Sequence, residues 1–149
     1  GPHGDFYLRA AEAPLLLMAG GSGLAPLLAL LEDALAEGVK RPVVLMFGAR
    51  TQADLDALDA IDRLRSQWPE EFTFLPILSE EPVGSKWAGL RGLITELIPT
   101  HAPAGCHAYL CGPPAMVDAA AAQLRQQGVN PEHVHADRFT TQGDVAAAA

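Results

Sequence analysis

The sequence predicts an α/β fold of three layers, in which helices cover both faces of a parallel five-stranded sheet. Two observations carry this prediction. Short, continuous apolar runs alternate along the chain with segments in which leucines or alanines recur at helical spacing. Glycine turns separate several of the runs from the segments that follow them. Strands that alternate with helices of this length form βαβ units, whose strands pair in parallel.

The first such unit is predicted over residues 14–47. Residues 14–19 are a continuous apolar run that predicts a buried strand, and the leucines between Leu24 and Leu35 recur at helical spacing. Gly38 is placed to end this helix. Residues 42–47 then predict a second buried strand, parallel to the first.

The pattern continues to the end of the chain. Pro76 within the third predicted strand favours an edge position or a bulge, because proline has no N–H group for a central strand. The remaining predicted elements are a helix over residues 55–64, a strand over 72–78, a polar loop over 79–89, a short helix over 90–98, a strand over 107–111, a helix over 115–127 and a strand over 134–139.

Length and charge limit the classes of protein to consider. The 149 residues suit one domain, and 49% hydrophobic residues are enough for a core. A formal net charge of −8 argues against nucleic acid or an anionic membrane as partner. The sequence has no apolar run long enough to cross a bilayer and no signal-peptide pattern at residues 1–5, which favours a cytoplasmic protein.

The two cysteines are predicted not to pair with each other. Cys106 and Cys111 lie five residues apart at a predicted strand, and an odd separation directs side chains to opposite faces of a sheet. Free buried thiols fit a reducing compartment.

A glycine-rich turn between the first strand and the first helix is the first candidate binding site. Backbone N–H groups and the positive end of the helix dipole attract phosphate at such a position. The spacing differs from the Rossmann fingerprint, because Pro26 stands where a third glycine would be, and a tight turn without a ligand is the alternative. The candidate residues are Gly20, Gly21, Ser22, Gly23, Leu24, Ala25 and Pro26.

A second motif follows the strand that ends at Cys111. A thiol there, before the rigid turn of Gly112, Pro113 and Pro114, would face the crevice at the carboxyl ends of the strands. Cys111 is equally well explained as a small buried hydrophobic residue.

The two motifs, in this order, resemble the nucleotide-binding domain of the ferredoxin–NADP reductase superfamily. Within it, the reductase components of phenol hydroxylase, methane monooxygenase and aromatic-ring dioxygenases are most similar. The resemblance implies that the glycine-rich turn receives a pyrophosphate and that Cys111, Gly112, Pro113 and Met116 lie beside the nicotinamide. Further matches are Gly48, Ala49 and Arg50 after the second strand and residues 137–139 at the end of the last one, where Phe139 is either a neighbour of the nicotinamide or flavin or a core residue.

The resemblance also bears on the choice of nucleotide. NADP-using relatives end the third strand in Ser-Arg, where the arginine receives the 2′-phosphate, whereas this chain has Ser79, Glu80 and Glu81. Two carboxylates would repel that phosphate, so NAD(H) is the predicted cofactor. Arg50, Lys86 and Arg91 are the cations that would reverse this prediction if they reached the same pocket.

The resemblance implies a domain order and a reaction. Residues 1–9 resemble the end of a flavin domain or a linker, residues 10–139 the NAD-binding domain, and residues 140–149 are expected to be a flexible tail. NADH would pass hydride to FAD on a preceding domain, in cis or in trans, and electrons would continue to a 2Fe–2S centre on another domain or protein and to a ferredoxin or oxygenase component. Cys111 would position the nicotinamide without acting as a nucleophile, and this electron-transfer reductase is expected to be inactive as an isolated domain.

Three other interpretations are weaker. A serine hydrolase built on Ser22 would need glycine where Leu24 stands. A non-catalytic nucleotide-binding module is compatible with the same motifs. A metal site is not expected, because no compact ligand pair of the usual spacing occurs among His101, Cys106, His107, His133 and His135.

Overall fold

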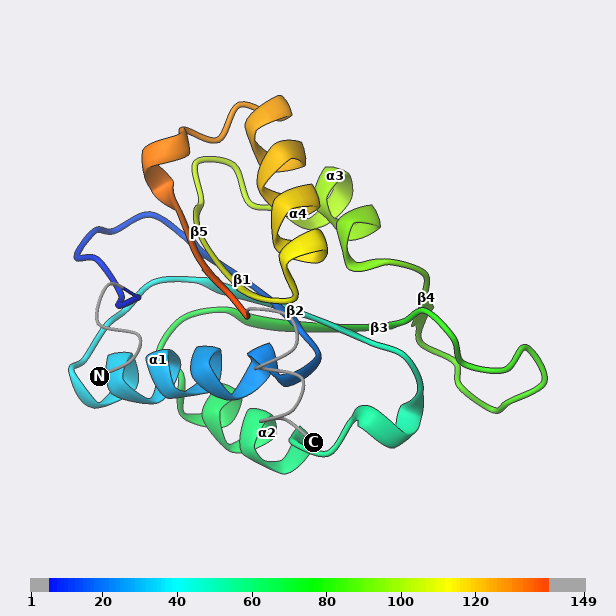
Figure 1. Ribbon diagram of the computed structural model, residues 1–149. Helices are drawn as coiled ribbons and strands as arrows, with labels where there is room; N and C mark the ends of the chain where they lie inside the picture. The colour runs from blue at the N-terminus through cyan, green and yellow to red at the C-terminus, as the bar shows by residue number, and fades with distance from the viewer. Residues whose placement is uncertain (1–5, 140–149) are drawn as a thin grey trace.

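A parallel sheet of six strands runs through the molecule with the order β4-β3-β2-β1-β5-β6 (Figure 1). The computed structural model describes residues 6–139. Every pair of neighbouring strands is parallel. The strands are β1 (Leu15–Gly20), β2 (Val43–Ala49), β3 (Phe72–Leu78), β4 (Leu90–Arg91), β5 (His107–Gly112) and β6 (Val134–Arg138).

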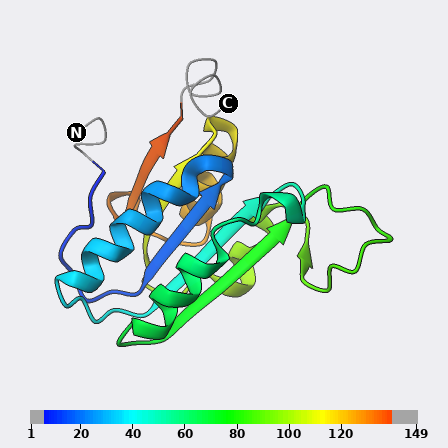
Figure 2. The ribbon, with the colours of Figure 1, turned by 90° about the horizontal axis from the view of Figure 1, so that it is seen from below.

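Helices cover both faces of this sheet, as predicted (Figures 1 and 2). The helices α1 and α2 lie on one face, and α3 and α4 lie on the other. Their bounds are Leu24–Ala36 for α1, Leu58–Gln67 for α2, Ile98–His101 for α3 and Pro114–Gln126 for α4, and the short 3-10 helices are η1 (Gly21–Gly23), η2 (Gln52–Asp54), η3 (Ile94–Leu97) and η4 (Pro131–His133). Gly38, with φ of 81°, follows the first helix as predicted.

The core is divided into two halves by the sheet. Alternate residues of β1 belong to opposite halves: Leu15 and Leu17 pack with α1 and α2, whereas Leu16 packs with α3 and α4. Cys111 lies in the first half and Cys106 in the second. The prediction that the two cysteines point to opposite faces is therefore confirmed, and both thiols are free.

Two predicted helices begin later than the apolar spacing indicated. Residues 90 and 91 form β4, the sixth strand, beside Ile77 and Leu78. Gly92 then has φ of 137°, which no helix allows, so the helical segment begins at Ile94. Likewise Leu55 only follows the turn η2, and α2 begins at Leu58.

Pro76 occupies an edge, as its missing N–H group predicted. β4 pairs with β3 only at Ile77 and Leu78, so the outer side of β3 at Pro76 has no neighbouring strand in the described part of the chain. Among the helices of residues 6–139, none combines the length and the apolar character that crossing a membrane requires.

Candidate functional site

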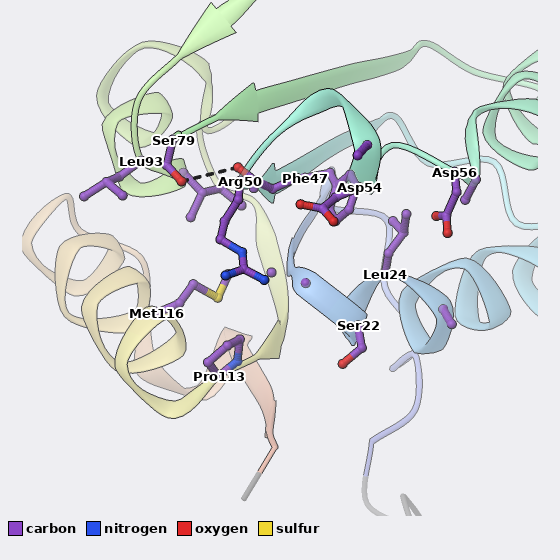
Figure 3. A pocket seen from close by; sticks show the side chains of 18 of the residues that line it. Ser22, Leu24, Phe47, Arg50, Asp54, Asp56, Ser79, Leu93, Pro113 and Met116 are labelled. Carbon is purple, nitrogen blue, oxygen red and sulfur yellow. Dashed lines mark hydrogen bonds between the residues drawn. The ribbon is translucent and has the colours of Figure 1, made fainter. Parts of the chain in front are cut away.

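The order of the strands places a cavity at the point where the chain reverses direction across the sheet. Connections run outward from β1 to β2 and β3 on one side, and β5 returns to the other side of β1. Ligands of open α/β sheets bind at the carboxyl ends of the strands at such a point. A cavity of about 900 Å³ opens there, lined by residues of the β1, β2, β3 and β5 ends, of η2 and of η3 (Figure 3).

The glycine-rich turn forms one wall of the cavity. Gly21 has φ of 54°, and a Cβ atom on it would meet no other atom within 4 Å, so its backbone is open to a ligand. No described side chain caps the first N–H groups of α1. Those groups, with the helix dipole, leave a position suited to a phosphate. Of the predicted residues in this turn, the cavity is lined by Gly20, Gly21, Ser22, Leu24 and Ala25, but not by Gly23 or Pro26.

Gly23 instead lies at the contact between the glycine-rich turn and the motif that begins at Cys111. A Cβ atom on Gly23 would lie 2.0 Å from the carbonyl oxygen of Cys111, closer than any real Cβ contact. Gly112, with φ of 158°, also lies close to Gly20, since its Cβ would be 3.1 Å from the Gly20 oxygen. The glycines allow the ends of β1 and β5 to meet backbone to backbone.

Cys111 lies beneath this junction. It is completely buried and does not line the cavity, whereas Pro113 and Met116 of the same motif do. Burial, and secondarily the charge of Asp137, raises the pKa of the Cys111 thiol to about 12. The thiol is therefore protonated near neutral pH and unsuited to nucleophilic attack. Its predicted place beside a nicotinamide stays a prediction.

Arg50 supplies a cation to the cavity. Gly48, Ala49 and Arg50, all predicted, line it from the end of β2. Gly48 packs closely against η3, since a Cβ atom on it would lie 3.1 Å from Cβ of Ile94. The Arg50 side chain extends into the cavity (Figure 3), where a guanidinium favours an anionic ligand.

The predicted acidic turn after β3 is arranged differently from the expectation. Ser79 lines the cavity, but Glu80 and Glu81 do not. The Glu81 carboxylate accepts hydrogen bonds from the backbone N and from Nε2 of Gln52, at 2.9 and 2.7 Å. These bonds lower the pKa of Glu81 and tie the turn after β3 to η2.

Arg91 and Lys86, two of the three cations considered as phosphate partners, also lie outside the cavity lining. The Arg91 guanidinium donates to the carbonyl oxygens of Glu81, Pro82 and Trp87 at 2.9 to 3.2 Å. Arg91 thus holds the loop after β3 in shape, and Arg50 is the cation that faces the cavity.

Two carboxylates that sequence reasoning did not assign to the site line its rim. Asp54 and Asp56 precede α2 and border the cavity. The Asp54 carboxylate accepts a hydrogen bond from the Thr51 backbone N at 3.3 Å, which fixes the η2 turn. The signal available in the sequence was their position directly after the second strand, where ligand-binding loops occur.

Phe139 and Ser22, two further residues considered from the sequence, differ in their position relative to the cavity. Phe139 is half-buried, packs against the core half of α1 and α2, and donates its backbone N–H to the Gly112 carbonyl at 2.9 Å, outside the cavity lining. Ser22 is at the cavity, but the lining found among the described residues contains no histidine to serve as its base. Nor do residues 6–139 bring together three acidic, histidine or cysteine side chains in a way that would hold a metal ion.

The sequence matches the oxidoreductase NAD-binding domain family over residues 17–122, a span that includes both cavity motifs. The chain belongs to this family. The resemblance to ferredoxin–NADP reductases that the four motifs indicated is thereby confirmed, together with the fold class.

Relatives of this NAD-binding domain include components of bacterial oxygenase systems. The chain is 44% identical over 139 residues to the xylene/toluene monooxygenase electron transfer component of Pseudomonas putida, and 34% identical over 150 residues to the phenol 2-monooxygenase reductase component of Pseudomonas sp. strain CF600. These alignments cover 93% and 98% of this chain, but 40% and 42% of the relatives. The chain thus spans about two fifths of their length.

Solved structures agree with the fold. The NAD-binding domain superimposes on a cytochrome P450 reductase from Amycolatopsis with a TM-score of 0.81 and 35% identity, over 91% of this chain and 41% of that one. A ferredoxin-NADP+ reductase from Plasmodium falciparum, at 14% identity and a TM-score of 0.67, shares the fold.

Proposed function

We propose that this domain binds NAD(H) in the cavity and presents the nicotinamide to a flavin carried by a neighbouring domain, in a reductase that supplies electrons to an oxygenase. The observation that carries the proposal is the meeting of the uncapped start of α1, Arg50 and the turn after β5 around one cavity in a member of the NAD-binding domain family. Relatives named as reductase or electron transfer components support the electron-transfer part.

Different residues of the cavity would contact different parts of the dinucleotide. The backbone of Gly21 and Ser22 and the guanidinium of Arg50 would hold the pyrophosphate. Pro113 and Met116 would lie against the nicotinamide end, with Cys111 beneath. Bound NADH supplies a hydride, and this chain contributes orientation of the ring.

The rim favours NAD(H) over NADP(H). Asp54 and Asp56 border the cavity near the end of β2, and their carboxylates would repel a 2′-phosphate while remaining able to accept a hydrogen bond from a ribose hydroxyl. Glu81, whose carboxylate is bonded to Gln52, contributes mainly by holding this rim together.

The wider assignment extends what the resemblance implies, and the relatives named as reductase or electron transfer components support it. FAD on a preceding domain, a 2Fe–2S centre on another domain or protein, and a ferredoxin or oxygenase as electron acceptor complete the proposed system. The isolated domain would then bind nucleotide without turnover. A non-catalytic nucleotide-binding module is the competing proposal, and a parent protein that binds flavin and reduces it with NADH would exclude it.

Calorimetric titration of the chain with NADH and NADPH tests the nucleotide site. Ser22→Asp adds a charge beside the proposed pyrophosphate position and should weaken NADH binding about tenfold or more, while an acidic residue at a helix start leaves stability intact. Ala119→Glu adds the same charge on an exposed turn of α4 and should not affect binding. Equal affinity of both variants for NADH would contradict the site. If the unaltered chain binds no nucleotide even with its flavin-bearing part restored, the function is wrong.

A further inference from the structure

The N-terminal segment, residues 6–13, has no helix or strand, yet it is attached to the domain by side chains from distant parts of the sequence. The backbone N–H of Arg9 donates to the Tyr109 hydroxyl at 2.9 Å, although the two residues are 100 positions apart. Tyr109 is completely buried in the middle of β5. A buried hydroxyl bonded to a backbone N–H holds that stretch of chain in one place.

A second buried side chain, Arg41, also forms hydrogen bonds with this segment. The Arg41 guanidinium donates from Nε to the Ala13 carbonyl at 2.7 Å and from Nη1 to the Arg9 carbonyl at 3.0 Å. Arg41 is only 4% exposed, and its own carbonyl accepts a hydrogen bond from Trp68 Nε1 at 2.7 Å, which anchors it to the core. Both backbone polar groups of Arg9 are therefore held, one by Tyr109 and one by Arg41.

Apolar contacts complete the attachment. The rings of Phe6 and Tyr109 meet edge to face with centroids 6.1 Å apart, and Phe6 and Leu8 pack against the core half of α1 and α2. Figure 2 shows the N-terminal segment, in dark blue, running beside α1 on the same side of the sheet. The segment therefore packs on the same face of the sheet as α1 and α2.

The attachment point is close to the proposed nicotinamide position. Tyr109 and Cys111 lie two residues apart on β5 and belong to the same half of the core, so they project to the same side about 7 Å apart along the strand. A displacement of the N-terminal segment at Tyr109 would therefore act on β5 only two residues before Cys111.

We propose that Tyr109 and Arg41 form a clasp on residues 6–13 that fixes where the chain enters this domain, and so sets the position of the flavin-bearing part relative to the nicotinamide. This inference rests on the proposed function for its second half, because only a preceding flavin-bearing part would be positioned. Tyr109 and Arg41 are positioning residues, since neither lines the cavity.

Trypsin cleavage after Arg9 tests the clasp in the chain itself. An unattached extended segment is a preferred cleavage site, whereas the clasp should protect this bond. Tyr109→Phe keeps the buried ring but removes the hydroxyl, and should make cleavage about fivefold faster, relative to the same site in urea-unfolded chain. Tyr7→Phe is the matched control, because the exposed Tyr7 hydroxyl makes no hydrogen bond with the described residues. Cleavage of the unaltered chain at the unfolded rate, or equal rates in both variants, would overturn the clasp.

Flavin reduction tests the positioning in a protein in which the flavin-bearing part precedes residue 1. With saturating NADH, Tyr109→Phe should slow flavin reduction roughly tenfold while the NADH dissociation constant stays the same, because orientation and not binding is lost. Faster trypsin cleavage with an unchanged reduction rate would overturn the positioning role and leave the proposed function intact. Absence of NADH-dependent reduction in the unaltered protein would overturn the proposed function and the positioning role together, while the trypsin result still decides the clasp.

Discussion

Gly23 lies against the backbone of Cys111 so closely that a Cβ atom on Gly23 would be 2.0 Å from the Cys111 carbonyl oxygen and 2.5 Å from its carbonyl carbon. The neighbour is the backbone of β5, which is paired with a strand on each side, so it cannot move aside as a flexible side chain would. The start of α1 and the end of β5 are therefore set at a fixed separation, and the two walls of the cavity with them.

Gly23→Ala should destabilise the domain by about 3 kcal/mol or more, because the methyl group has no space and the sheet must shift. Urea unfolding followed by circular dichroism measures this change. Gly84→Ala is the control, since a Cβ there meets no atom within 4 Å and its φ is not positive, and stability should change by less than about 0.5 kcal/mol. Similar midpoints for both variants would mean that the two backbones are not in contact.

Asp54→Asn should raise the affinity for NADPH about tenfold and change the affinity for NADH little, because the variant loses a charge but keeps an acceptor for the Thr51 N–H group. Competition between the two nucleotides in calorimetry measures the ratio. Glu80→Gln, which removes a charge outside the cavity lining, should leave the ratio unchanged. A changed ratio for Glu80→Gln and an unchanged ratio for Asp54→Asn would indicate that the turn after β3 selects the nucleotide.

Folding stability should fall as the pH is lowered through about 6.5. Burial is the main cause that lowers the pKa of His107 and of His135. The charges of His133 and Arg41 lower the pKa of His107 further, and those of Arg9, His107 and His133 lower the pKa of His135 further. The unfolded chain then binds more protons than the folded chain between the ordinary histidine pKa and the lowered one, so acid favours unfolding by at most about 1.4 kcal/mol per pH unit for each histidine.

The groups that face these histidines come from several elements. The rings of His107 on β5 and His133 on η4 stack with centroids 3.9 Å apart, and His135 on β6 lies against the Tyr109 ring at 4.9 Å. Asp137, two residues further along β6, adds an acidic group on the same face. Urea midpoints between pH 5 and 7.5 should show a shallower slope for His135→Gln than for the unaltered chain. An unaltered slope in the variant would exclude His135 from this effect.

Both thiols should be inert in the folded protein. Burial raises the pKa of Cys106 and of Cys111, the latter to about 12, and both side chains are inaccessible. Labelling with a disulfide reagent at pH 8 should therefore proceed no faster than unfolding, and 6 M urea should expose two thiols. Prompt labelling of either thiol under native conditions would contradict this prediction.

The long elements were predictable because burial leaves a clear pattern in the sequence. β1, β2 and β5 are nearly continuous apolar runs, as expected for strands covered on both faces. β4 left no such pattern, because it has only two residues, both exposed, and it exists through pairing with Ile77 and Leu78. Local spacing cannot report a strand whose stabilisation comes entirely from its neighbour.

The site was predicted in part for a similar reason. The glycine-rich turn and Arg50 follow strand ends directly, so topology placed them at the cavity. Glu81 and Asp54 look alike in the sequence, and only the fold shows that the first is bonded to Gln52 while the second borders the cavity. Which way a loop carboxylate turns depends on partners far along the chain.

Pro76 has a consequence for how copies of this domain avoid one another. The carbonyl of Glu71 and the N–H of Ser79 bond to β2, so the odd-numbered residues of β3 direct their backbone groups inward and Pro76 directs its nitrogen to the outer edge. An uncovered strand edge is a template on which a second chain can add a strand and begin aggregation. Proline offers no hydrogen there to recruit one, and the short β4 covers the next two residues. Replacing Pro76 would put this protection against edge-to-edge association at risk before it altered anything at the nucleotide site.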